Sequence, residues 1–136
     1  NVTAQWAVKP ALLDKPTTVD LTSPGGRLHE ARRLILDQVK ASPYFDLVAP
    51  GGAIYAFPRV RADVVPHFDD TAFALRLLDE ENVLVVPGTS FNLPASRHLR
   101  LTLLPELSQL SEVFARMDRV LGRMVADSRP VASAVA

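Results

Sequence analysis

Residues 98–105, HLRLTLLP, decide the fold class, because they predict a half-buried strand. Leucine recurs at every second position from Leu99 to Leu103, alternating with Arg100 and Thr102. Successive side chains of a strand point to opposite faces, so one face here is apolar and the other is polar. The apolar face requires a covering layer, which helices elsewhere in the chain can supply.

Two long amphipathic helices are expected to form that cover. The first begins at Thr22-Ser23-Pro24 and ends before Ser42-Pro43, since proline disfavours helix at the preceding residue. The second begins near Glu106. Their apolar positions recur at three- and four-residue steps, which is typical of a helix with one buried face. These positions are Leu28, Ala31, Leu34, Ile35 and Val39, then Leu107, Leu110, Val113, Phe114, Met117, Val120, Leu121 and Met124.

Shorter elements complete the pattern. Asn1 is expected to cap a short helix reaching Ala11, and Asp69-Asp70 to start another that ends near Glu80. Short strands are predicted at 45–48, 53–57 and 83–86. The first two are read as a hairpin or an adjacent pair across the turn at 49–52, and the helix from Asp69 could connect parallel strands. The expected fold is α+β, a two-layer sandwich whose small, mostly antiparallel sheet is covered by helices on one face.

Composition excludes several classes of function. The 136 residues suit one domain, and 15 basic side chains balance 15 acidic ones, so charge gives no reason to expect nucleic acid or an anionic membrane as partner. The chain has no cysteine and no apolar run long enough to span a bilayer. Its three histidines lack metal-ligand spacing, so no metal site is predicted.

Arg100 is the one candidate binding residue in this pattern. Most arginines are solvated or form structural ion pairs, and Arg100 could be either. Alternatively, its planar guanidinium offers two parallel hydrogen bonds to a carboxylate. The acidic pairs Asp69-Asp70 and Glu80-Glu81 are explained by helix capping and solvation, so no catalytic residue is assigned.

Four segments, in order, resemble the class I/II aminotransferases of fold type I, and within them the alanine/aspartate aminotransferase-like branch. Residues 50–58, PGGAIYAFP, are similar to the family's PxGAxYxFP strand, and residues 77–92, LLDEENVLVVPGTSFN, to the LLxEExVLVVPGxxFN segment that follows it. Residues 98–105 resemble its HxRxxxLP strand, and residues 25–32 the start of its long interdomain helix.

The resemblance implies a domain division and a role for Arg100. It assigns residues 1–13 to the tail of a large cofactor domain, 14–126 to the C-terminal small domain, and 127–136 to a disordered tail. Arg100 falls where the family's arginine binds the substrate α-carboxylate. The parent enzyme is expected to be a cytoplasmic homodimer that uses pyridoxal 5'-phosphate to move an amino group between an alanine- or aspartate-like amino acid and a 2-oxo acid.

The cofactor-binding residues of that family are expected to lie outside this chain. Its lysines are Lys9, Lys15 and Lys40, and none has the Ser-x-x-Lys context of the family's Schiff-base lysine. The chain also lacks an initiator methionine, which suggests a piece of a longer protein without its N-terminal large domain. It is therefore expected to contribute the substrate-binding Arg100 and to be inactive alone.

Two alternatives remain open. The chain could be a non-catalytic domain of aminotransferase-like fold that binds an amino acid through Arg100, either free-standing or attached to a transcription regulator. A lyase or decarboxylase of the same family would share both the fold and Arg100.

Overall fold

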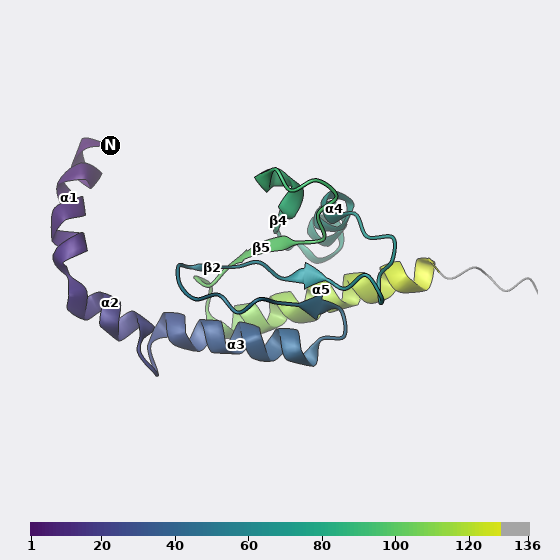
Figure 1. Cartoon of the computed structure of the whole chain (residues 1–136), viewed down its shortest axis with the longest axis horizontal. Helices are drawn as coiled ribbons and strands as arrows, with labels where there is room; N and C mark the ends of the chain where they lie inside the picture. The colour runs from purple at the N-terminus through teal and green to yellow at the C-terminus, as the bar shows by residue number, and fades with distance from the viewer. Residues whose placement is uncertain (129–136) are drawn as a thin grey trace, which may run out of the picture.

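The computed structural model describes residues 1–128 and forms helical and sheet layers with an N-terminal arm (Figure 1). The helices are α1 (Val2–Leu13), α2 (Lys15–Thr22), α3 (Arg27–Ala41), α4 (Asp70–Glu81), the short 3₁₀ helix η1 (Gly88–Phe91) and α5 (Leu107–Asp127). The strands are β1 (Phe45–Asp46), β2 (Tyr55–Ala56), β3 (Arg59–Val60), β4 (Val86–Pro87) and β5 (Leu99–Thr102). The α+β class with an antiparallel sheet is confirmed.

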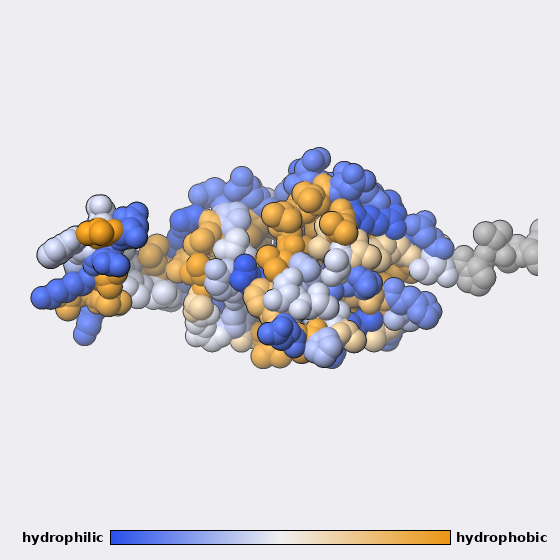
Figure 2. Space-filling view, turned by 90° about the horizontal axis from the view of Figure 1, so that it is seen from above, coloured by the Kyte–Doolittle hydropathy of each residue, from blue (hydrophilic) through white to orange (hydrophobic). Residues whose placement is uncertain are grey.

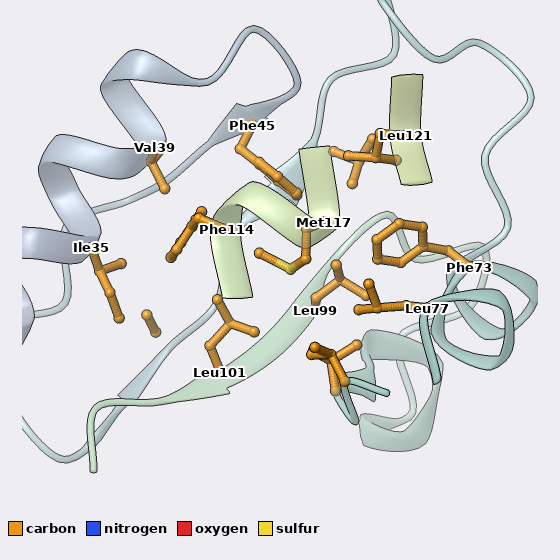
Figure 3. Packing of buried hydrophobic residues seen from close by; sticks show 14 of the residues in the cluster. Ile35, Val39, Phe45, Phe73, Leu77, Leu99, Leu101, Phe114, Met117 and Leu121 are labelled. Atoms are coloured by element: carbon orange, nitrogen blue, oxygen red, sulfur yellow. The ribbon is translucent and has the colours of Figure 1, made fainter. Parts of the chain in front are cut away.

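β5 is the central strand of the main sheet, in the order β2-β5-β4 with antiparallel pairing throughout. Its predicted alternation is observed, because Leu99 and Leu101 are buried whereas Arg100 and Thr102 are only half-buried. The buried leucines face α5 (Figure 3). One strand thus joins the core on one side to the candidate binding residue on the other.

The core lies between this sheet and helices α3, α4 and α5. Figure 3 shows Ile35 and Val39 of α3 near Phe114 of α5, with Phe73 of α4 approaching from the other end. The largest fully buried side chains are Phe73, Phe114, Ile35, Leu77, Leu99, Met117 and Leu121. The helical stripe predicted for α5 is therefore its buried face, and the helix begins at a capping box formed by Glu106 and Gln109.

The predicted hairpin of 45–48 and 53–57 is wrong. β1 pairs with β3, and β2 pairs with β5. Backbone groups on both sides of β2 are bonded to the β5 segment, since Ile54 accepts a hydrogen bond from the N–H of Leu103 and Pro58 accepts one from Leu99. This long-range pairing leaves residues 49–53 as a loop and not as a tight hairpin turn. Parallel pairing across α4 is also absent from residues 1–128.

Three predicted boundaries also differ. α3 begins at Arg27 rather than near Thr22, because a separate helix, α2, ends at Thr22 and Gly25 then adopts a positive φ of 87°. Strand β4 keeps only Val86 of the predicted 83–86 segment. At the C-terminus, Asp127 still belongs to α5, and the rest of the predicted disordered tail from residue 129 onward lies outside the described residues.

Helices α1 and α2 contribute no buried residue, and Figure 1 shows α1 standing away from the layers. The predicted cap of α1 is confirmed, because the side chain of Asn1 accepts a hydrogen bond from the N–H of Ala4. Figure 2 shows the same arm as a separate lobe carrying both apolar and charged side chains. Among residues 1–128, no helix is both long and apolar enough to cross a membrane.

A candidate carboxylate site at Arg100

Arg100 projects from β5 on the face opposite the buried leucines. Its guanidinium carbon lies 4.7 Å from the ring centroid of Tyr55 and 5.0 Å from that of Phe91. Tyr55 belongs to the neighbouring strand β2, and Phe91 ends η1. Such distances are those of cation–π contacts, so two rings from different elements hold one cation.

Arg100 is also the one arginine within residues 1–128 that forms no hydrogen bond or ion pair with another described residue. Arg59 and Arg61 are bonded to aspartates, and Arg32 donates to the carbonyl of Pro50. Arg97 donates to backbone carbonyls, including that of Val60 at 2.9 Å. The structural ion pair considered for Arg100 from the sequence is therefore not formed within the described residues, and its donors remain available to a ligand.

The aromatic contacts continue behind Phe91. The Phe91 ring meets Phe57 edge to face at 5.9 Å between centroids, and Phe57 stacks on His98 at 4.9 Å and 11°. Burial, followed by the charge of Arg59, lowers the pKa of His98 below its usual value. His98 is therefore expected to be neutral near pH 7 and to act as a flat packing partner for Phe57.

A hollow of about 200 Å³ opens beside Arg100. Apart from Arg100 and Thr102, its walls are mainly apolar side chains from residues 83–86 and from the first turns of α5. A cation at the margin of an apolar recess suits a small molecule that carries one carboxylate and a short non-polar portion.

The acidic pairs Asp69-Asp70 and Glu80-Glu81 form contacts that helix capping and solvation do not explain. Asp69 caps α4 as predicted, accepting a hydrogen bond from the N–H of Ala72 at 2.7 Å. Asp70, however, is only 2% exposed and binds Thr89, so capping and solvation do not explain it. Solvation is also wrong for Glu81, whose side chain is 12% exposed and binds Arg119 and Arg123. Sequence reasoning missed these contacts because their partners lie far along the chain.

Sequence reasoning also missed Tyr55, Phe57 and Phe91 as neighbours of Arg100. The motifs containing them were recognised, but their contacts depend on the β2–β5 pairing that the predicted hairpin had excluded. Within residues 1–128, no group of three or more His, Cys, Asp or Glu side chains could hold a metal ion.

The residues of this chain do not fit pyridoxal phosphate on their own. Covalent attachment of that cofactor needs a lysine. Lys9, Lys15 and Lys40 are all exposed, on α1, α2 and the last turn of α3, and none lines the hollow beside Arg100. The Arg100 site therefore offers guanidinium donors but no attachment point for the cofactor.

Sequence comparison places these features in a known family. The family model described as aminotransferase class I and II matches residues 2–116. The alanine aminotransferase of Mycobacterium tuberculosis is 41% identical over 121 residues, which cover 89% of this chain and 28% of that protein. The glutamate-pyruvate aminotransferase AlaA of Escherichia coli is 35% identical over 121 residues, covering 89% of this chain and 30% of that protein.

Solved structures agree with this relationship. A crystal structure of an aminotransferase from Escherichia coli matches with a TM-score of 0.71 and 34% identity, over 76% of this chain and 26% of that one. The alanine aminotransferase from Pyrococcus furiosus matches with a TM-score of 0.63 and 30% identity, over 71% and 24%. The chain thus spans less than a third of the length of these relatives, and it belongs to the class I and II aminotransferases, in their alanine/aspartate aminotransferase-like branch.

Proposed function

We propose that the chain is the C-terminal part of a pyridoxal-phosphate-dependent transaminase and that Arg100 binds the α-carboxylate of its substrate. The observation that carries this proposal is the unpaired guanidinium of Arg100, held between two aromatic rings on a half-buried strand. The family membership and the alanine and glutamate–pyruvate specificities of the relatives support an alanine-like amino acid and a 2-oxo acid as substrates.

Arg100 would act by fixing one end of the substrate. Its planar fork matches the two oxygens of a carboxylate, and the two charge-assisted hydrogen bonds define orientation as well as position. With that end held, the α-carbon and its amino group would take a defined orientation relative to Arg100. Fixing the reacting group in this way lowers the entropic part of the barrier. Tyr55 and Phe91 also restrict the position of the guanidinium through their cation–π contacts.

The rest of the chemistry would belong to the remainder of the enzyme. Pyridoxal phosphate supplies the electron sink for amino-group transfer when it is bound there, together with the attachment lysine. This chain, if separated from that part, is expected to be inactive. Residues 1–13 would be the tail of the large domain and residues 14–126 the small domain of a cytoplasmic homodimer.

The decisive experiment replaces Arg100 in the complete enzyme. Arg100→Ala should raise the KM for both the amino acid and the 2-oxo acid by roughly tenfold to a hundredfold, because a charge-assisted contact is lost. Arg100→Lys should recover only part of this, since lysine keeps the charge but not the fork. An unchanged KM in Arg100→Ala would exclude the proposed role.

A matched control is available on α3. Arg33 is exposed and pairs with Glu30, so Arg33→Ala and Arg33→Lys should leave both KM values unchanged. If these variants altered KM as much as the Arg100 variants do, the effect would reflect general charge and not a carboxylate site.

A non-catalytic amino-acid-binding or regulatory domain is the second candidate. It is favoured by the position of all three lysines on exposed surfaces away from the Arg100 hollow. The gene decides between the two: a large domain with a Ser-x-x-Lys segment encoded before Asn1 supports the transaminase, and a natural start near Asn1 supports the binding domain. A lyase or decarboxylase is distinguished by the products formed from alanine.

A further inference from the structure

Asp70 is a buried carboxylate that the proposed function leaves without a role. It lies in the first turn of α4, but the neighbouring Asp69 already provides the cap. The Oδ2 atom of Asp70 accepts a hydrogen bond from the backbone N–H of Thr89 at 2.9 Å, and Oδ1 accepts one from the Thr89 hydroxyl at 3.1 Å. The hydroxyl of Thr71 lies 3.3 Å from the same Oδ1 atom. Both carboxyl oxygens of Asp70 therefore bind Thr89, which belongs to η1.

The other side of η1 is fixed equally firmly. The N–H of Gly88 donates to the carbonyl of His98 at 2.8 Å. A Cβ atom at position 88 would stand 2.1 Å from Oγ of Ser96 and 3.0 Å from the carbonyl oxygen of His98, so η1 fits closely against residues 96–98 only with glycine there. η1 is therefore held between α4 and the start of β5 at its first two residues.

The side chain that η1 delivers to the site is Phe91, two residues after Thr89. Its ring lies 5.0 Å from the guanidinium carbon of Arg100 and rests against Phe57. Asn92 then adopts a left-handed conformation, with φ of 57°, and ends the segment. Movement of Thr89 away from Asp70 would consequently change the position of the ring against Arg100.

We propose that the Asp70–Thr89 contact is a positioning device for carboxylate binding, acting on Arg100 through Phe91. Asp70 does not touch the substrate; it sets the place of the ring that restricts the guanidinium. The inference rests on the proposed function, because it requires Arg100 to be the carboxylate-binding group. It extends that function by assigning a purpose to a residue 30 positions earlier in the sequence.

A double-mutant cycle in the complete enzyme tests the proposal. Asp70→Ala removes both oxygens that accept the Thr89 hydrogen bonds, whereas an asparagine could keep both contacts by donating its amide N–H to the Thr89 hydroxyl. Phe91→Leu removes the ring. The primary measurement is the dissociation constant of propionate by calorimetry, since propionate offers a carboxylate and cannot react. KM and kcat for alanine are measured alongside.

We expect Asp70→Ala to weaken propionate binding by about threefold, in proportion to one partly buried guanidinium–ring contact. KM should rise by a similar factor, with a smaller change in kcat. In the Phe91→Leu background, Asp70→Ala should cause no further loss, because the ring through which Asp70 acts is gone. The control Asp69→Asn alters the adjacent acid, which is exposed and contacts Ala72 instead of Thr89, so it should leave propionate binding unchanged.

Two results would overturn the inference. One is unchanged propionate binding in Asp70→Ala. The other is the same loss with or without Phe91, which would make Asp70 a purely structural residue. Arg100→Ala separates this failure from that of the proposed function: if it weakens propionate binding while Asp70→Ala does not, only the positioning role is lost. If Arg100→Ala has no effect, the carboxylate site and the inference both fail.

Discussion

Arg100 contacts two aromatic rings, whereas many arginines of folded proteins pair with acidic side chains. An ion pair would occupy the N–H edge of the guanidinium, which is the edge a substrate carboxylate needs. Tyr55 and Phe91 instead lie within cation–π distance, an interaction with the ring face that leaves the in-plane donors unused. The side chain is thereby ordered before a ligand arrives, and less conformational entropy is lost on binding.

Tyr55 provides a direct test of this ordering. Tyr55→Leu in the complete enzyme should raise the KM for alanine by about two- to fivefold, because one ring is lost from the guanidinium. Tyr55→Phe retains the ring and should behave like the natural enzyme. Steady-state kinetics of the two variants make the comparison. A large effect of Tyr55→Phe would instead assign the role to the hydroxyl.

The sequence predicted Arg100 but not its surroundings, and the difference has a physical cause. Arg100 is visible locally, because strand periodicity separates it from its leucine neighbours. Asp70 is hidden by Asp69, since two adjacent acids at a helix start look alike in sequence. Only the fold brings Thr89 to one of them and leaves the other in solvent.

At the level of elements, the end of α4 is tied to α5 by charge. The carboxylate of Glu81 lies 2.8 Å from an Arg119 nitrogen and 2.7 Å from an Arg123 nitrogen, and Arg116 donates to the Glu81 carbonyl. Hydrogen bonds from Arg119 and then Arg123 lower the pKa of Glu81 to about 2. These contacts hold α4 in place, and with it Asp70.

The pH dependence of stability should report this cluster. A carboxyl group whose pKa is lower in the folded state stabilises that state above its unfolded pKa of about 4.5, and the contribution disappears as the pH falls toward 2. The natural chain should therefore have a higher Tm than Glu81→Gln at pH 7. The difference should shrink steadily between pH 5 and pH 2 (~3 units).

Asp79→Asn, also on α4, is the control for the Glu81 measurement. Asp79 is exposed and forms no ion pair with another described residue, so its substitution should leave the Tm nearly unchanged. A Tm difference for Glu81→Gln that stayed constant from pH 7 to low pH would show that shape or packing, and not charge, is responsible.

Gly88 gives a second test at the element level. Gly88→Ala places a methyl group 2.1 Å from Ser96 Oγ and 3.0 Å from the His98 carbonyl, so η1 must shift. Overpacking of this kind typically costs 1–3 kcal/mol, and a loss of about that size is expected in urea unfolding. Gly51→Ala is the control, because nothing lies within 4 Å of a Cβ atom there and its φ is not positive. Equal losses in both variants would exclude the proposed clash.

At the scale of the elements, local sequence patterns predicted whether a segment is helix or strand better than they predicted which strands pair. Helices α3, α4 and α5 were recognised because their apolar spacing lies within each segment. Strand β2 was assigned to the wrong neighbour, because its partner is about 45 residues away and the intervening turn residues favoured a hairpin. α2 was not predicted from the sequence, although its proline lies in the first turn, where proline is compatible with helix.

At the scale of the whole molecule, the fold class could be predicted from the apolar faces that the sequence patterns give to the strand and the helices. A strand with one leucine face and helices with one apolar stripe can bury those surfaces only by forming two layers. Leu99 is 0% exposed at their junction. These patterns predict no packing partner for α1, because its apolar residues are dispersed around the helix and none is buried.

Removal of residues 1–13 should accordingly leave the layered part intact. Since α1 buries no side chain, the deletion should change the free energy of unfolding by less than about 0.5 kcal/mol. Leu99→Ala, in the same chain, should cost about 2–5 kcal/mol, because it leaves a cavity under β5. Urea unfolding followed by far-ultraviolet circular dichroism compares the two. A large loss on deletion would show that the arm supports the core.

The exposed arm has a consequence for spectroscopy. Trp6 is the chain's single tryptophan and is 81% exposed, on an element remote from the core. Its fluorescence should already have the red-shifted emission of a solvated indole in the native state, so it would hardly respond when the layers unfold. The same indole would shift to the blue if another polypeptide covered α1. Tryptophan emission from this chain would therefore report the binding of another polypeptide to α1 and would change little when the layers unfold.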